Sequence, residues 1–243
     1  MSLEPFSAFI TGTDTHVGKT VLTSLLLAHQ RAHDVDAMVM KPVQTGCERN
    51  DNGNLIPPDP LYCLRVAGLS EQNVDMDVIC PYRFALPASP HLAAAQENQT
   101  ISMDVILRAY ETLKARHQSV LLEGAGGVFV PLNERETMLD LMRAVGAPVI
   151  VAARAGLGTL NHTLLTLAAL REAKLDVAGI VLIQSTPEPW GCIEQDNLAT
   201  LKRMASAPVW GAIRYLPEPG AGPETYARMR ACFHGDGPFA AIP

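Results

Sequence analysis

Short apolar segments alternate with longer segments of helical periodicity along most of the chain. Continuous apolar stretches are typical of strands buried on both faces of a sheet, whereas apolar residues three and four positions apart are typical of helices. This pattern predicts six strands, at residues 5–11, 37–41, 119–123, 148–153, 177–183 and 208–213. It also predicts helices at residues 19–33, 101–117, 159–173 and 194–205.

The alternation of strands and helices predicts an α/β fold with a mainly parallel, doubly wound sheet and helices on both faces. Proline-rich stretches near Pro57, Pro87 and Pro217 are interpreted as loops rather than as linkers between domains. We therefore expect a single domain over residues 1–243.

Polar or glycine-rich segments follow each of the six predicted strands. In a doubly wound sheet ligands bind beyond the carboxyl ends of the strands, so these segments form the candidate site. One glycine-rich match would be weak support, whereas such segments at successive strand ends are much stronger support. In chain order they are GTDTHVGKT, KPVQTG, EGAGG, RAGLGTLNH, QSTPEP and RYLPEPG.

The first of these segments resembles a phosphate-binding loop with one additional residue. The usual loop has four residues between its first glycine and the Gly-Lys-Ser/Thr end, whereas five residues separate Gly12 from Gly18. Backbone N–H groups and the following helix N-terminus would attract phosphate oxygens, Lys19 would reach the β- and γ-phosphates, and the Thr20 hydroxyl would bind magnesium. The alternative is an ordinary glycine turn, but strand, loop, Lys-Thr and helix follow one another in the order that phosphate binding requires.

Three further residues could take part in this chemistry, and each has a structural alternative. Lys41 ends a strand, where it is either a surface residue or a cation directed into the ligand site. Glu123 precedes a glycine-rich stretch, where a carboxylate opposite a phosphate loop is a natural magnesium ligand; the alternative is a solvated side chain. Asp59, taken alone, is better explained as the N-cap of a helix with Pro60 at its first position.

Composition and charge exclude several classes of function. The 243 residues carry a net charge of −6 and no run of Lys or Arg, which argues against nucleic-acid and membrane partners.

The chain begins without a signal-peptide pattern, and its apolar stretches are far shorter than the roughly 20 residues of a membrane span. The five cysteines contain no Cys-x-x-Cys pair, as expected for a cytoplasmic protein with reduced thiols. Zinc-hydrolase and serine-hydrolase motifs are absent from the sequence.

Four segments together, TGTDTHVGKT, KPVQTG, LPASPHLAA and LEGAGGVFVPL, resemble the dethiobiotin synthetase family. The resemblance runs from about Phe9 to about Leu216, and the five-residue spacing of the phosphate loop is a feature of that family. It implies the P-loop NTPase type of α/β fold and an ATP- and Mg²⁺-dependent ligase of biotin synthesis. The implied reaction converts 7,8-diaminopelargonate, carbon dioxide and ATP to dethiobiotin, ADP and phosphate.

The resemblance also implies roles for individual residues. Lys41, Lys19 and Thr15 would be catalytic, and Thr20, Asp59 and Glu123 would hold magnesium. The nucleotide would be bound by His16, Val17, Gly18, Lys19, Thr20, Val21, Asp59, Glu123, Gly124, Ala125, Gly126, Ile183, Gln184, Arg214, Tyr215 and Leu216. The substrate would be bound by Thr15, Lys41, Thr45, Gly156, Leu157, Gly158, Thr159 and Asn161.

The resemblance further implies a homodimer with the substrate at the subunit interface, where the partner's segment 156–162 would meet the substrate's carboxylate tail. Three positions depart from the family pattern. His16 stands where many members have glutamate, Ile183 where an asparagine usually reads adenine, and Arg214 where a proline usually lies beside the base. The last two departures concern the selection of the nucleotide base.

Two rival functions share a phosphate loop. A partition-type or assembly ATPase would act as a switch, but such proteins usually carry a second lysine early in the loop, and Thr13, Asp14 and Thr15 supply none. An amidating ligase of cobalamin synthesis would need a glutaminase domain with a cysteine nucleophile, for which the given sequence is too short.

Overall fold

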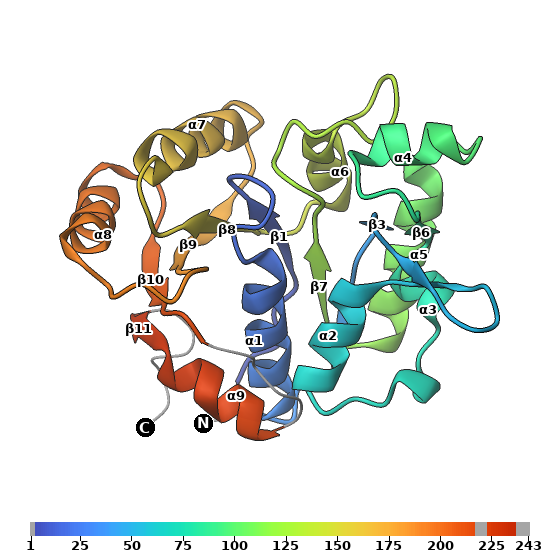
Figure 1. The fold of residues 1–243 in the computed structure, drawn as a ribbon, viewed down its shortest axis with the longest axis horizontal. Coiled ribbons are helices and arrows are strands. Elements are labelled where there is room, and N and C mark those ends of the chain that lie inside the picture. Colours follow the sequence, from blue (N-terminus) through green and yellow to red (C-terminus); the bar gives the residue numbers. More distant parts are fainter. Residues whose placement is uncertain (1–2, 217–222, 237–243) are drawn as a thin grey trace.

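A seven-stranded sheet forms the centre of the computed structural model, which describes residues 3–216 and 223–236 (Figure 1). The strand order is β11-β10-β9-β8-β1-β7-β2, and all neighbours are parallel except β10 and β11. The predicted α/β fold with a mainly parallel sheet is thereby confirmed. The strands are β1 (Ala8–Gly12), β2 (Ala37–Met40), β7 (Ser119–Glu123), β8 (Val149–Arg154), β9 (Val177–Ile183), β10 (Val209–Ile213) and β11 (Phe233–Gly235).

The six predicted strands all form, and the differences at their ends have local causes. The first strand begins at Ala8 rather than at residue 5, because the backbone of Phe6 exchanges hydrogen bonds with the side chain of Gln30. The second ends before Lys41, whose N–H donates to the carbonyl of Ile79 at 2.8 Å instead of to a neighbouring strand. The edge strand β11 was not predicted.

The four predicted helices also form, as α1 (Lys19–Arg31), α5 (Met103–Arg116), α7 (Thr159–Glu172) and α8 (Cys192–Met204). The sequence did not indicate the shorter elements, because helices of nine residues or fewer complete too few turns for a clear periodicity. These are α2 (Pro58–Val66), α3 (Met76–Ile79), α4 (Pro90–Gln96), α6 (Met138–Val145), α9 (Pro223–Ala231), the 3₁₀ helix η1 (Glu71–Asn73) and the two-residue strands β3 (Val43–Gln44), β4 (Glu48–Arg49), β5 (Leu55–Ile56) and β6 (Tyr82–Arg83).

Helix α1 lies against the middle of the sheet and fixes the first loop in place. It contacts β1, β2 and β7, and it also packs against α2 and α9, while α5 contacts β7 (Figure 1). Every residue of β1, β2 and β7 is buried, as expected for parallel strands covered on both faces. The carboxyl ends of these three neighbouring strands therefore lie together at one end of a buried, rigid part of the sheet.

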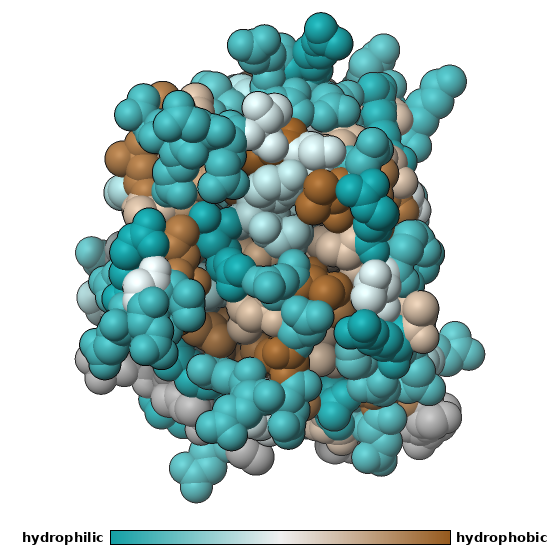
Figure 2. All heavy atoms as spheres, turned by 90° about the vertical axis from the view of Figure 1, so that its right-hand side faces the viewer, coloured by the Kyte–Doolittle hydropathy of each residue, from teal (hydrophilic) through white to brown (hydrophobic). Residues whose placement is uncertain are grey.

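The surface over α3, α4 and α5 is mainly hydrophilic, with hydrophobic residues in small groups (Figure 2). Among the residues that the structure describes, no helix is long and apolar enough to cross a membrane. The cytoplasmic location stays a prediction.

A buried histidine joins α1 to the C-terminal helix α9. His29 is completely buried, and its Nδ1 lies 2.8 Å from the hydroxyl of Tyr226. Burial lowers the pKa of His29 from 6.5 to about 4, with smaller contributions from the charges of His33 and Arg230. His29 is therefore neutral at physiological pH.

This histidine predicts a loss of stability in acid. Between pH 6.5 and 4 the unfolded chain protonates His29 and the folded protein does not, so the free energy of unfolding should fall, by at most about 3 kcal/mol. His29→Gln, which does not titrate, should show a shallower fall of melting temperature from pH 7 to pH 4. Parallel pH profiles for the two proteins would contradict this assignment.

Candidate active site

A cavity of about 890 Å³ lies beyond the carboxyl ends of β1, β2, β7, β9 and β10. The structure thus brings together most of the residues proposed from the sequence, although they come from segments up to about 200 positions apart. Those that line the cavity are Thr15, His16, Gly18, Lys19, Thr20, Val21, Lys41, Thr45, Asp59, Glu123, Ala125, Gly126, Ile183, Gln184, Arg214, Tyr215 and Leu216.

The remaining proposed residues lie outside the lining of this cavity. Val17 and Gly124 are buried. The segment 156–161 lies at the start of α7, where Leu157 and Asn161 are exposed. Thr159 is buried, and its hydroxyl is 3.3 Å from that of Thr163. Within one chain, the segment that follows β8 therefore does not line the cavity formed at the ends of the other strands.

The cavity also has lining residues to which the sequence analysis assigned no role. Four of them belong to the motif LPASPHLAA, so this motif could have indicated from the sequence that the segment lines the site. The additional residues are Val43, Gln44, Gly46, Pro58, Pro87, Ala88, Ser89, Pro90, Val130, Ser185 and Ile213.

The phosphate loop depends on two glycines. A Cβ on Gly12 would lie 2.8 Å from the backbone oxygen of Asp14, to which Nζ of Lys19 donates, so a larger residue would displace the loop. Gly18 has φ 96° at the N-cap of α1, and a Cβ there would lie 2.6 Å from the Ile183 side chain. Because Gly18 supplies no side-chain cap, the helix N-terminus presents its first N–H groups towards the cavity, as phosphate binding requires.

Among the residues that the structure describes, Lys19 pairs with a backbone carbonyl across the loop rather than with a carboxylate. Its ammonium donates to the carbonyl of Asp14 at 2.9 Å. Burial, together with repulsion from Lys41, lowers the pKa of Lys19 to about 8, against the opposing effect of nearby carboxylates. A phosphate bound at the helix N-terminus would place a negative charge next to the Lys19 ammonium and so favour its protonated form.

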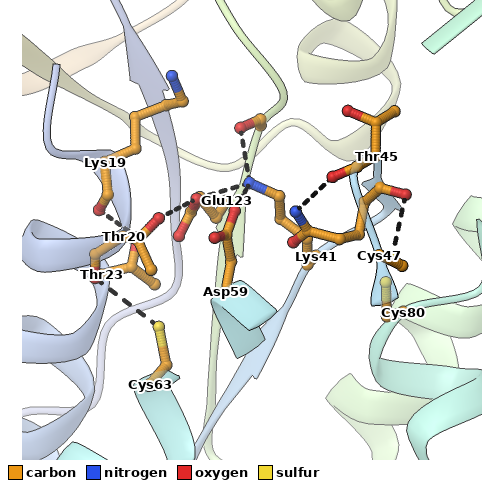
Figure 3. Close-up of polar contacts among 12 residues, drawn as sticks. Lys19, Thr20, Thr23, Lys41, Thr45, Cys47, Asp59, Cys63, Cys80 and Glu123 are labelled. Atoms are coloured by element: carbon orange, nitrogen blue, oxygen red, sulfur yellow. Dashed lines mark hydrogen bonds and ion pairs between the residues drawn. The ribbon is translucent and has the colours of Figure 1, made fainter. Parts of the chain in front are cut away.

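Lys41 is the centre of a buried network (Figure 3). Its Nζ lies 2.6 Å from Oε1 of Glu123 and 2.7 Å from Oδ2 of Asp59, and the Thr20 hydroxyl donates to the same Glu123 oxygen at 2.9 Å. Burial lowers the pKa of Lys41, but the two carboxylates outweigh this effect and raise it above its ordinary value. Of the two interpretations of Lys41, the structure thus favours the cation directed into the site over the surface residue.

Asp59 is not a helix cap. Helix α2 begins at Pro58 and its N-cap is Pro57, so the interpretation of Asp59 as N-cap is wrong. Its carboxylate is directed to Lys41, whose charge and hydrogen bond outweigh burial and lower the pKa of Asp59. Asp59 is therefore charged in this network at neutral pH.

The oxygen atoms around Glu123 suit a magnesium ion. Its Oε2 is buried and has no hydrogen-bond partner among the described residues, and the Thr20 hydroxyl and Asp59 carboxylate are close by. Mg²⁺ prefers oxygen ligands and usually takes one or two carboxylates, with phosphate and water completing the shell. No group of three or more His, Cys, Asp or Glu suited to a metal occurs in the described part of the chain.

The far end of the cavity is formed by the segments that follow β9 and β10. The side-chain amide of Gln184 donates to the carbonyl of Glu188, and its oxygen accepts from the N–H of Tyr215 at 3.3 Å. The guanidinium of Arg214 lies 5.5 Å from the ring centroid of Trp190. Gln184 therefore ties the two segments together, and both ends of its amide are engaged.

Comparisons with known proteins show the family to which this chain belongs. A family model described as an AAA domain matches residues 7–221. An ATP-dependent dethiobiotin synthetase BioD of Anaeromyxobacter sp. (strain K) is 46% identical over 180 residues, covering 74% of this chain and 77% of the relative. Another, of Thermodesulfovibrio yellowstonii, is 38% identical over 217 residues, covering 86% and 89%. The chain belongs to the dethiobiotin synthetase family.

Two solved structures share the fold of this chain. The MinC:MinD cell division protein complex of Aquifex aeolicus matches with a TM-score of 0.56 at 10% identity, covering 88% of this chain and 83% of that one. Chloroplast FtsY of Physcomitrella patens matches with a TM-score of 0.51 at 15% identity; this chain spans 61% of that structure's length. At these identities the likeness concerns the fold alone.

Gly18 offers a test of the loop geometry. Gly18→Ala should lower stability by about 1–2 kcal/mol through backbone strain, and further because its Cβ overlaps Ile183; it should also abolish nucleotide binding. Gly53→Ala is the matched control, since Gly53 also has positive φ but nothing lies within 4 Å of its Cβ. Equal losses of melting temperature in the two variants, with nucleotide binding retained in both, would contradict the proposed packing.

Proposed function

We propose that this protein catalyses the ATP-dependent formation of dethiobiotin from 7,8-diaminopelargonate and carbon dioxide. The observation that carries the proposal is that two lysines, two carboxylates and a phosphate loop line one cavity in a chain that is 46% identical to a named dethiobiotin synthetase. The identity to these relatives also favours a ligase over a partition-type ATPase switch. We also propose that residues 1–243 form a single domain.

The proposed reaction proceeds in three steps. An amine of the substrate attacks carbon dioxide and loses a proton, giving a carbamate. A carbamate oxygen attacks the γ-phosphorus of ATP, which releases ADP and gives a carbamic-phosphoric anhydride. The second amine attacks the carbamate carbon, loses its proton and expels phosphate, so that the ureido ring closes.

The cavity supplies positive charge for the second step, in which two anions must approach each other. Lys19 and the N-terminus of α1 would hold the phosphates, and Lys41 would stabilise the carbamate and the transferring phosphoryl group. Thr15 and Thr45 would donate hydrogen bonds to substrate and phosphate oxygens. Thr20, Asp59 and Glu123 would hold Mg²⁺, which, when bound, would neutralise charge on the phosphate oxygens.

The dimer is supported by exposed apolar residues beside the site. Phe129 and Leu165 are 65% and 61% exposed, and both line a second cavity of about 420 Å³ that Asp14 of the phosphate loop also lines. Val130 lines both cavities. A second copy covering this surface would bring its α7 N-terminus to the substrate, where helix N–H groups would meet a carboxylate.

Lys41 provides the test of the proposed activity. With diaminopelargonate, bicarbonate and MgATP, the wild type should release ADP and form dethiobiotin in equal amounts. Lys41→Ala and Lys41→Gln should each lose about a hundredfold or more of this rate, because the developing charge loses its cation. Lys114→Ala, on the exposed face of α5, should retain the wild-type rate. A near-normal rate in the Lys41 variants would remove this residue from the mechanism.

The dimer makes a separate prediction. Leu165→Glu should dissociate the homodimer in sedimentation velocity, whereas Ile193→Glu, which alters an exposed apolar residue on α8, should not. Asn161→Ala should raise the KM for diaminopelargonate more than the KM for ATP. A wild-type monomer that is fully active at every dilution would contradict the proposal that two subunits share the site.

Nucleotide choice gives the last prediction. Ile183 has no polar atom for the base, the Gln184 amide is engaged by backbone groups, and Arg214 donates hydrogen bonds without accepting them. We therefore expect GTP or CTP to support a substantial fraction of the ATP rate at equal subsaturating concentrations. Ile183→Asn should sharpen the preference for ATP. A preference of about a thousandfold in the wild type, some 4 kcal/mol, would mean that backbone groups read the base.

A further inference from the structure

The Lys41 ammonium occupies the position between the proposed magnesium carboxylates (Figure 3). It lies 2.6 Å from Glu123 and 2.7 Å from Asp59, and it is 3.4 Å from the carbonyl of Gly124. The side chains of Lys41 and Glu123 are only 5% and 1% exposed. The proposed reaction needs this same lysine at the carbamate and the γ-phosphate. Before ligands bind, however, its charge is paired with the carboxylates of Glu123 and Asp59.

An ammonium and a divalent cation compete for these oxygens. Glu123 Oε1 already accepts from both Lys41 and Thr20, and a metal ion at the same carboxylates would repel the lysine strongly in this poorly solvated site. Conversely, removal of the ammonium would leave a buried carboxylate pair without a counter-charge, which is costly. The flexible stem of lysine lets its charge move while its backbone stays in place.

We propose that Lys41 is an internal counter-cation that keeps Mg²⁺ out of the nucleotide-free site and is displaced into the cavity when Mg²⁺ enters with the nucleotide. This inference rests on the proposed function, because it takes the metal and nucleotide roles from there. It adds that the metal and the catalytic lysine exchange places. The lysine then reaches the carbamate only when both the metal and the nucleotide are present.

The alternative is a permanent structural ion pair. In that case Lys41 would stay between the carboxylates during turnover, and the metal would be held without them. The two accounts differ in whether these carboxylates bind the metal in the wild type once nucleotide is present. Exchange requires that the metal binds better without Lys41 and predicts that Asp59→Asn, with Lys41 retained, weakens Mn²⁺ binding in the presence of ADP. A permanent ion pair predicts that Asp59→Asn leaves that binding unchanged.

Mn²⁺ is a suitable probe, because its free form can be counted by electron paramagnetic resonance. In nucleotide-free protein, Lys41→Met should bind Mn²⁺ at least about tenfold more tightly than the wild type. Lys19→Met is the matched control: it removes the same charge from the same cavity, but Lys19 pairs with the carbonyl of Asp14 rather than with a carboxylate. Its affinity should change by less than about threefold. Lys41→Arg keeps the positive charge and should not bind Mn²⁺ more tightly than the wild type.

Thermal unfolding gives a second readout that does not depend on activity. Lys41→Met should melt below the wild type without metal, and Mn²⁺ should raise its melting temperature more than that of the wild type. A Lys41→Met protein that folds only with Mn²⁺ present would support the proposal; should it not fold at all, Lys41→Gln replaces it in both measurements. Adding Asp59→Asn should abolish the gain in affinity.

Equal Mn²⁺ affinities for the wild type and the neutral Lys41 variants would overturn the inference. Dethiobiotin synthesis by the wild type is measured separately, so the two proposals can fail independently. A wild type that makes dethiobiotin while Lys41→Met gains no Mn²⁺ affinity disproves the exchange alone. A gain in Mn²⁺ affinity by Lys41→Met, together with a wild type that makes no dethiobiotin, disproves the proposed activity alone.

Discussion

The ion pairs between the buried Lys41 ammonium and the carboxylates of Glu123 and Asp59 hold the site together. They join the end of β2, the first turn of α2 and the end of β7, and the Thr20 hydroxyl extends the network to α1. Buried charges are tolerated only when they are paired, so each partner fixes the position of the others. The cavity next to this network therefore has a defined shape before any ligand enters.

The same network sets the charge of the cavity. The protein as a whole is acidic, with a net charge of −6, yet its proposed ligands are anions. Within the site the two lysines balance the two carboxylates, and the helix N-terminus adds partial positive charge. Anionic ligands are thus accommodated by local arrangement rather than by the overall field of the protein.

Much of the fold could be predicted from local sequence patterns, but contacts between residues far apart in the chain could not. The long apolar strands and the helices of thirteen or fourteen residues were predicted because each element repeats its own period several times. Strand-end segments indicated the site because parallel strands end at one edge. Nothing local indicates that Asp59 meets Lys41 or that Glu123, 82 positions away, meets it too. The engagement of Gln184 by backbone groups likewise depends on how two loops fold against each other.

In the proposed reaction a carbamate oxygen attacks the γ-phosphate within this cavity, and the fate of that oxygen can be followed with an isotope label. In a single turnover started with carbon dioxide labelled with oxygen-18, ring closure expels phosphate together with the attacking oxygen. Each molecule of inorganic phosphate formed with dethiobiotin should then contain one labelled oxygen. Unlabelled phosphate, measured by mass spectrometry before the carbon dioxide exchanges its oxygens with water, would contradict it.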